Sequence, residues 1–310
     1  MTPRPVLEFL ALAAIWGASF LFMRIAAPVF GPVALMLIRC GVGAATLLAI
    51  LLYLGRGRQL LAASGRLSIV GVLNSAIPFV LLGYATLTLS AGVTSILNSL
   101  APLWSAVVAF AWLGDRLTRT QIVGLVCGAV GVCILAMGGG GVGDGGAPGS
   151  SADGMAVGSL VLPFLAGILA TAFYGYAANF TRRYLAGVDP LATATGSQLS
   201  ATAFLLLPGV LLWPVPAVDV APPTTAVWVA AIILGVICTG IAYLLFFRLI
   251  ASIGATRTIS VTFVIPLFGV GWGYLFLYER VDLFTAAGAV VIVLGTALTT
   301  GVLLGKKAGA

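Results

Sequence analysis

Long apolar runs, separated by short polar segments, repeat along the whole chain. A helix that crosses a bilayer needs about 20 predominantly apolar residues, and ten segments of roughly this length can be drawn. The predicted spans are residues 5–26, 33–54, 67–88, 93–113, 120–137, 155–180, 191–213, 226–247, 258–278 and 283–304. The pattern therefore predicts an all-α integral membrane protein with ten transmembrane helices.

Part of this pattern occurs twice. Residues 101–134 recur, shifted by 164 positions, in residues 265–298. Each copy reads as an apolar helix containing a proline, a charged turn, and a second apolar helix with two glycines seven residues apart. The matched positions are Pro102 and Pro266, Leu103 and Leu267, Leu113 and Leu277, Asp115 and Glu279, Arg116 and Arg280, Gly124 and Gly288, and Gly131 and Gly295. Because proline, arginine and both glycines fall in register, we interpret the copies as an internal duplication.

A glycine-rich segment separates the two copies. Residues 138–154 hold nine glycines in 17 positions, a composition typical of a flexible linker. The predicted organisation is a first five-helix repeat over residues 1–137, this linker, and a second five-helix repeat over residues 155–310. Five is an odd number of spans, so the second repeat enters the membrane from the opposite side. Inverted repeats of this kind are typical of secondary transporters, whose site lies near the midplane between the repeats.

Composition and charge agree with this assignment. The chain is 61% hydrophobic and 7% charged, whereas a soluble domain carries about 25% charged residues. A net charge of +7 would suggest nucleic acid as the partner of a soluble protein. In a membrane protein such charge sets orientation instead, so no nucleic-acid partner is expected.

The positions of the basic residues predict the orientation. With the N-terminus in the cytoplasm, only Arg24, Arg39 and Arg280 of the 15 Lys and Arg residues fall outside or in the outer half. The others, at inner ends, are Arg4, Arg56, Arg58, Arg66, Arg116, Arg119, Arg182, Arg183, Arg248, Arg257, Lys306 and Lys307. Positive residues gather on the cytoplasmic side, so both termini are predicted to be cytoplasmic.

Several chemistries lack the residues they need. The chain has no histidine, and its four cysteines lie inside apolar runs without metal-ligand spacing. There is no GxxxxGK[ST] phosphate-binding loop and no cluster of acidic residues. Neither a metal nor a cofactor is expected, and the sequence does not predict an enzyme.

The whole chain resembles the EamA-like, ten-helix branch of the drug/metabolite transporter superfamily. The residues that carry the resemblance are Trp16-Gly17, Pro32 with Arg39, Pro102 followed by LGDRLTRTQIVGLVCGAVGV, Tyr174-Gly175, Pro190, and FLYERVDLFTAAGAVVIVLG. Members of this branch mostly export amino acids and other small metabolites. The resemblance implies the same activity here.

Prolines inside the spans indicate candidate hinges. A proline leaves the carbonyl four residues earlier without its helical hydrogen bond, and irregular backbone in a membrane is tolerated beside protein or a water-filled cavity. The predicted hinges are Pro78, Pro102 and Pro266, and the polar residues four positions before them are Asn74, Asn98 and Thr262. These three are candidate substrate contacts, and the alternative is that they only join helices.

Aromatic and charged residues complete the candidate site. Trp16, Tyr84, Tyr174 and Tyr243 lie near the polar positions or correspond between repeats, and could line the site of an amphipathic substrate. Two charged residues are candidates for substrate binding or gating, namely Arg39 in the second span and Glu8 near the inner end of the first. For each, a structural role at the helix end remains an alternative.

We therefore expect a secondary transporter of the inner (plasma) membrane that exports amino acids or related small metabolites by alternating access, with aromatic amino acids as one candidate group. A small-molecule substrate and the lipid bilayer are the expected partners, and the chain can act as a monomer. One alternative is a proton-coupled efflux protein for drugs or organic cations that uses Glu8. A membrane-embedded enzyme or channel is another, disfavoured by the missing histidine and the lack of a filter sequence.

The orientation can be tested by labelling. Cysteines introduced within residues 138–154 should react with an impermeant reagent applied to intact cells, because this linker is predicted to lie outside. Cysteines beside Lys306 should react only after the cells are opened. The reverse pattern would overturn the predicted orientation.

Overall fold

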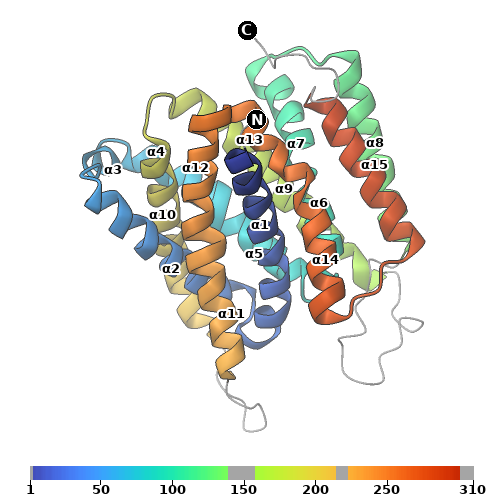
Figure 1. The fold of residues 1–310 in the computed structure, drawn as a ribbon, viewed down its shortest axis with the longest axis horizontal. Helices are drawn as coiled ribbons and strands as arrows, with labels where there is room; N and C mark the ends of the chain where they lie inside the picture. Colours follow the sequence, from blue (N-terminus) through green and yellow to red (C-terminus); the bar gives the residue numbers. More distant parts are fainter. Residues whose placement is uncertain (1–2, 139–157, 214–222, 301–310) are drawn as a thin grey trace.

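The structure is a computed structural model that describes residues 3–138, 158–213 and 223–300, and these residues form a bundle of helices (Figure 1). Most of the predicted linker, and the ends of the predicted spans at residues 155–157 and 301–304, lie outside the described residues. Within the described part there is no strand. The predicted fold class, an all-helical membrane protein built from two repeats, is confirmed.

The first repeat contributes five apolar helical stretches. They consist of α1 (Pro3–Phe30), α2 (Pro32–Tyr53), α4 (Ser64–Gly71) with η1 (Val72–Ala76) and α5 (Ile77–Ala85), α6 (Ala91–Asn98) with α7 (Ala101–Val108) and η2 (Ala109–Leu113), and α8 (Arg119–Met137). A short surface helix, α3 (Arg58–Ala62), connects the second stretch to the third.

The second repeat has the same order of elements. It consists of α9 (Gly158–Tyr184), α10 (Pro190–Leu211), α11 (Thr225–Gly235) with η5 (Val236–Ile241) and α12 (Ala242–Ile253), α13 (Ala255–Ile259) with η6 (Ser260–Phe263) and α14 (Ile265–Leu277), and α15 (Leu283–Thr299). Nine stretches among the described residues are long and apolar enough to cross a membrane, and α15, with 17 residues, is shorter. The eighth stretch continues to Ile253, beyond the predicted end at residue 247.

Polar caps define where several helices begin. Thr118 accepts a hydrogen bond from the Gln121 amide, and the Gln121 side chain accepts one from the Thr118 amide, so α8 starts with a capping box. At the equivalent start of α15, Asp282 caps the amide of Thr285 at 2.6 Å. These caps satisfy backbone donors that would otherwise be unpaired where the chain re-enters the apolar region.

The two repeats pack by equivalent pairs of helices. The first helix of each repeat lies against the fourth stretch of the other, so α1 packs on α14 and α9 packs on α7. The second helices, α2 and α10, pack on one another, and so do the last helices, α8 and α15, at one edge of the bundle (Figure 1). As ten spans require, α1 starts and α15 ends at the same end of the bundle (Figure 1).

Glycines allow these helices to approach closely. A side chain at Gly17 of α1 would meet the backbone nitrogen of Gly269 at 2.9 Å, and one at Gly175 of α9 would meet that of Ser105 at 2.6 Å. These two glycines occupy equivalent positions in the two repeats. Small residues at such crossings are typical of membrane helices, whose association depends on close packing.

A single added methyl group should separate the last two helices. In Gly295→Ala the Cβ atom would lie 2.7 Å from the Gly124 carbonyl oxygen and 2.9 Å from the Gly128 nitrogen, and neither backbone atom can move easily. We expect this variant to lower the melting temperature in detergent, at a cost of about 1–3 kcal/mol. The control is Gly271→Ala, whose added carbon has open space around it. Equal melting temperatures for the two variants would contradict this packing.

Candidate functional site

Two π-helical turns lie at equivalent positions in the repeats. The segment η1 spans Val72–Ala76, and η5 starts 164 residues later at Val236. Pro78 lies two residues after the end of η1 at Ala76, whereas η5 has no proline, so proline alone does not explain the pair. A π-turn inserts an extra residue into the helix and often occurs at functional sites. Both turns carry polar side chains, Asn74 and Ser75 in η1 and Thr239 in η5.

Arg39 of α2 lies against the second of these turns. Its side chain is 5% exposed, and Nε donates to the Thr239 hydroxyl oxygen at 3.1 Å. That hydroxyl donates in turn to the Leu234 carbonyl at 3.0 Å, which leaves a lone pair facing Arg39. The Nη1 atom lies 3.8 Å from the sulfur of Met23, and the guanidinium carbon lies 3.8 Å from the ring centre of Phe79.

No carboxylate forms an ion pair with Arg39 in the part of the chain that the structure describes. A guanidinium group stays charged and offers five N–H donors. A buried charge without a counter-ion is costly in a membrane protein. The contacts of Arg39 therefore leave the site with a positive charge.

Aromatic rings lie near this charge. Tyr174 of α9 lies edge-on to Phe79 at 6.5 Å between ring centres, and Trp16 of α1 lies edge-on to Tyr243 of α12 at the same distance. Both tyrosines have Arg39 as a charged neighbour. They are enclosed by the bundle, yet their side chains keep part of their surface accessible. The rings and the guanidinium thus belong to one interior cluster.

A neutral polar network adjoins this cluster. The Ser75 hydroxyl lies 3.1 Å from the Ser197 hydroxyl of α10 and accepts a hydrogen bond from the Gln198 amide nitrogen at 3.0 Å. The buried Gln198 Oε1 has no hydrogen-bond partner among the described residues. Asn74 and Gln198 both lie beside the hydroxyl of Tyr243, which connects the network to Arg39.

The two halves of the site correspond residue by residue. Both α2 and α10 have 22 residues and begin with proline, and Arg39 and Ser197 occupy the same position in them. Their partners, Thr239 and Ser75, are 164 residues apart, as the duplication requires. The Arg39–Thr239 and Ser197–Ser75 contacts are therefore equivalent. One carries a charge and the other is neutral.

Five of the predicted site residues belong to this central cluster: Trp16, Arg39, Asn74, Tyr174 and Tyr243. The structure places Tyr84 elsewhere, at the end of α5 and 38% exposed. Asn98 is the last residue of α6, and Thr262 donates to the Ile259 carbonyl at 2.9 Å within its own 3₁₀ turn. Within the described part of the chain, neither Asn98 nor Thr262 contacts Arg39 through a hydrogen bond.

Sequence reasoning did not identify Ser75, Phe79, Ser197, Gln198 and Thr239. The signal that could have found Ser197 and Gln198 is the alignment of the two proline-started spans, in which they correspond to Arg39 and Cys40. Phe79 directly follows a predicted hinge. Nothing in the sequence marks a π-turn at Thr239, because no proline is present there.

The predicted hinge prolines lie at three helix starts. Pro102 and Pro266 begin α7 and α14, and the helix is interrupted before each of them. The interruption is a turn at Ser99 and Leu100 in the first repeat and the 3₁₀ segment η6 in the second. Pro78 lies in a stretch that remains helical and follows the π-turn.

Glu8 lies at the end of the bundle where α1 starts, and not in the cluster. It accepts from Arg248 at 2.7 Å and from Arg4 at 3.3 Å. At the same end, Asp115 pairs with Arg182 at 2.8 Å. Both Glu8–Arg248 and Asp115–Arg182 join one repeat to the other.

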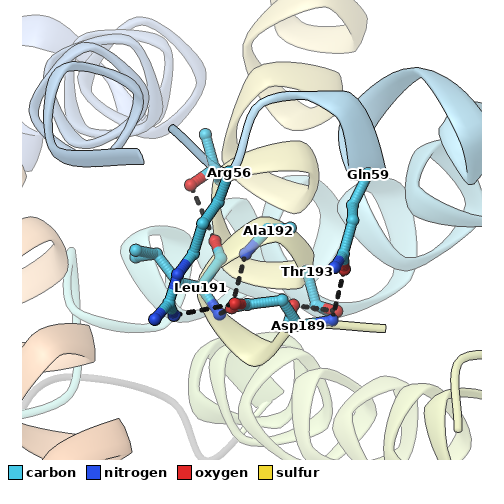
Figure 2. A network of polar contacts seen from close by, with 7 residues as sticks. Arg56, Gln59, Asp189, Leu191, Ala192 and Thr193 are labelled. Carbon is cyan, nitrogen blue, oxygen red and sulfur yellow. Dashed lines mark hydrogen bonds and ion pairs between the residues drawn. The ribbon is translucent and has the colours of Figure 1, made fainter. Parts of the chain in front are cut away.

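A third connection at this end is centred on Asp189 (Figure 2). Its carboxylate accepts from Arg56 of the other repeat at 2.8 Å and from the amide of Leu191 at 2.7 Å, and so caps α10. The backbone amide of Asp189 donates to Gln59 Oε1 at 2.7 Å. One carboxylate thus starts a helix and joins the repeats (Figure 2).

The opposite end depends on Glu279, in the turn between α14 and α15. This side chain is 6% exposed and accepts from the backbone amides of Ala91, at 2.8 Å, and Gly92, at 3.3 Å, at the start of α6. Tyr278 has φ 56°, a left-handed conformation unusual for a residue other than glycine. At the equivalent position the first repeat has Gly114, with φ 75°.

Arg24 is the charged neighbour of Glu279, and its Nη1 atom donates to the carbonyls of Thr86 and Leu87 at 2.7 and 2.8 Å. The positions equivalent to Glu279 and Arg24 are Asp115 in the first repeat and Arg182 in the second, and these two pair at the opposite end. The two ends are thus closed by related groups, exposed at one end and buried at the other. Burial raises the pKa of Glu279, although the bonds from Ala91 and Gly92 and the charge of Arg24 oppose this.

The ten apolar helical stretches among the described residues, the internal inverted repeat and the polar cluster where the repeats meet define a multi-pass membrane protein of the transporter class. The sequence profile of the EamA-like transporter family matches residues 4–137 and again residues 161–301. The chain belongs to this family. The resemblance inferred from the sequence is confirmed.

Similar proteins include named transporters. The chain is 25% identical to Protein PecM of Dickeya dadantii over 90% of this chain and 86% of that protein. It is 25% identical to the uncharacterized transporter YvbV of Bacillus subtilis over 72% of this chain and 67% of that protein. Over 40% of this chain and 42% of the other, it is 28% identical to a probable terminal-alkyne amino-acid exporter of Streptantibioticus cattleyicolor. A crystal structure with 19% identity shares the fold, with a TM-score of 0.66 over 99% of this chain and 100% of that one.

The raised pKa of Glu279 predicts how stability depends on pH. An acid whose pKa is higher in the folded state than in the unfolded state stabilises the fold at low pH, and this contribution is lost as the pH rises through the folded-state pKa. We therefore expect the melting temperature to rise as the pH falls towards the ordinary pKa range of a glutamate. Glu279→Gln is uncharged and should flatten this dependence, whereas the exposed equivalent variant Asp115→Asn should retain it. A slope unchanged in Glu279→Gln would show that burial does not control this carboxyl group.

Proposed function

We propose that the protein is a secondary transporter that exports amino acids, or related small metabolites, by alternating access at the Arg39 cluster. The observation that carries this proposal is a set of polar groups with unused hydrogen-bonding capacity, which lies beside aromatic rings where the repeats meet. The family and the printed name of the S. cattleyicolor relative support it.

The cluster offers complementary groups for an amino acid. A carboxylate needs a cation, which Arg39 supplies, and an ammonium group needs acceptors, which Gln198 Oε1 and the Asn74 amide supply. Aromatic faces of Trp16 and Tyr174 suit an apolar or aromatic side chain. These groups bind and orient a solute, and we assign them no bond-making step.

Alternating access requires that the two ends open in turn. One end carries exposed ion pairs between the repeats, and such pairs contribute little and can be exchanged for water. The other end is closed by the buried Glu279 at the start of α6. With both termini in the cytoplasm of an inner membrane, the Glu279 end faces outward, and release there is export.

The alternative is proton-coupled efflux of drugs or organic cations through Glu8. Two observations favour amino-acid export over this alternative. Glu8 is held by Arg4 and Arg248 at the helix ends, so no free carboxylate is offered to a cation. In addition, the charge in the central cluster is positive and would repel a cation. The surface hollows beside Glu8 lie at the bundle end, lined by residues such as Phe9 and Ser252.

Counterflow in proteoliposomes tests the function. Purified protein should exchange radiolabelled amino acids, with leucine, phenylalanine and tryptophan as probes, and should not exchange the cations ethidium and tetraphenylphosphonium. Exchange of the cations alone would contradict the proposal. Glu8→Gln separates the readings further, because transport that does not use Glu8 should keep a substantial fraction of its rate. A folded Glu8→Gln protein without any exchange would favour the proton-coupled alternative.

A further inference from the structure

The two arginines inside the spans of the first repeat differ in how their donors are used. Arg24 donates to two backbone carbonyls at 2.7 and 2.8 Å, which are strong acceptors. Arg39 has a hydroxyl at 3.1 Å and a thioether sulfur at 3.8 Å. Sulfur is a weak acceptor. The fold thus supplies Arg24 with strong hydrogen-bond acceptors. It supplies Arg39 with one hydroxyl and one weak acceptor, so part of the hydrogen-bonding capacity of Arg39 stays unused.

Snorkelling does not account for Arg39. It lies seven residues into α2, about 10 Å along the helix, and its side chain does not extend to the helix end. Its contacts are instead with Met23, Phe79 and Thr239, which belong to three other elements of the bundle. The guanidinium is therefore held towards the interior, between α1, α5 and η5.

The missing partner of Arg39 has a defined chemistry. Planar guanidinium groups bind carboxylates through two parallel N–H···O bonds, which are among the strongest hydrogen bonds in proteins. Nε is already held by Thr239, which fixes the orientation of the group. Phe79 lies over the guanidinium, 3.8 Å from its carbon to the ring centre, and its ring offers no hydrogen-bond acceptor for the remaining N–H groups. An anion that brings its own apolar part would also contact the rings of Tyr174 and Tyr243.

We propose that Arg39 binds the carboxylate of the transported molecule and thereby restricts this transporter to substrates that carry a carboxylate. The proposal rests on the proposed function and adds the group that selects the substrate. Arg39 has the neutral Ser197 at the equivalent place in the second repeat. The site therefore has one cationic side and takes a substrate in one orientation, with its carboxylate towards α2.

Matched ligands test this selection. Purified full-length protein in liposomes should bind and exchange phenylalanine and phenylacetate, and should discriminate by about tenfold or more against phenethylamine and phenylalanine amide, which lack the carboxylate. Arg39→Gln should reduce the apparent affinity for phenylalanine about tenfold or more and remove the discrimination. Arg39→Lys keeps the charge without the planar fork, so it should give an intermediate affinity.

Two further variants separate ligand binding from a structural role. Arg58→Gln removes an exposed arginine from the short helix α3 and should leave affinity and discrimination unchanged. Thr239→Val removes the hydrogen bond that holds Arg39, and should lower the melting temperature while the preference for carboxylates remains. If Arg39 only connected α2 to η5, Thr239→Val would instead reproduce the loss of affinity seen in Arg39→Gln.

The outcomes distinguish this proposal from the proposed function. Exchange of phenylacetate but not of amino acids would reject amino-acid export and keep the role of Arg39. Exchange of amino acids with equal affinity in Arg39→Gln and wild type would reject the role of Arg39 and keep amino-acid export. A wild-type protein that binds the amines as well as it binds the acids, or that binds no acid in the panel, overturns the proposal. If Arg39→Gln does not insert, the Arg39→Lys comparison decides alone.

Discussion

Close approach of the first helix of each repeat to the fourth stretch of the other is the constraint on which the bundle depends. Gly17 lies on the backbone of Gly269, and Gly175 lies on that of Ser105, with no room for a side chain at either crossing. Lipid offers no hydrophobic drive for helices to associate, so contact of this kind holds them together. Because each crossing joins the two repeats, the space between them is defined by the same contacts that stabilise the fold.

The charged groups at the two ends of the bundle also join one repeat to the other. The carboxylates Glu8, Asp115 and Glu279 at the bundle ends all have partners in the other repeat. At one end Glu8 and Asp115 pair with arginines of the other repeat and stay partly exposed. At the other end Glu279 is enclosed and uses backbone amides as partners. An exposed ion pair can be exchanged for water at small cost, whereas opening the enclosed end exposes Glu279 and frees two amides. The two ends therefore differ in what opening them requires.

Much of this could be predicted from the sequence, and the limits have physical causes. Apolar runs of bilayer length and a duplication with proline and glycine in register predict the fold, because lipid leaves helices as nearly the only choice. Tyr174 and Tyr243 were predicted because they correspond between repeats or lie near polar positions. The contact partner of Arg39, Thr239, was not predicted, because this contact depends on a π-turn that no residue type marks. Conversely, Thr262 was predicted from its proline, but in the structure its hydroxyl bonds to its own 3₁₀ turn.

The two repeats share a backbone arrangement but differ in the side chains at some equivalent positions, and these differences make the two sides of the site unequal. Two identical repeats in opposite orientation would give a site with two equal sides, unable to orient a substrate that has a different group at each end. Here α2 presents Arg39 to a hydroxyl in η5, while α10 presents Ser197 to a hydroxyl in η1. The backbone geometry is shared, so the difference in charge arises from a single side chain. In the transport function proposed above, the fixed positive charge on one side and the buried acceptor on Gln198 would orient a dipolar solute. In the proposed function, substrate orientation depends on positions where the repeats differ, whereas the close helix crossings use positions, such as Gly17 and Gly175, where they agree.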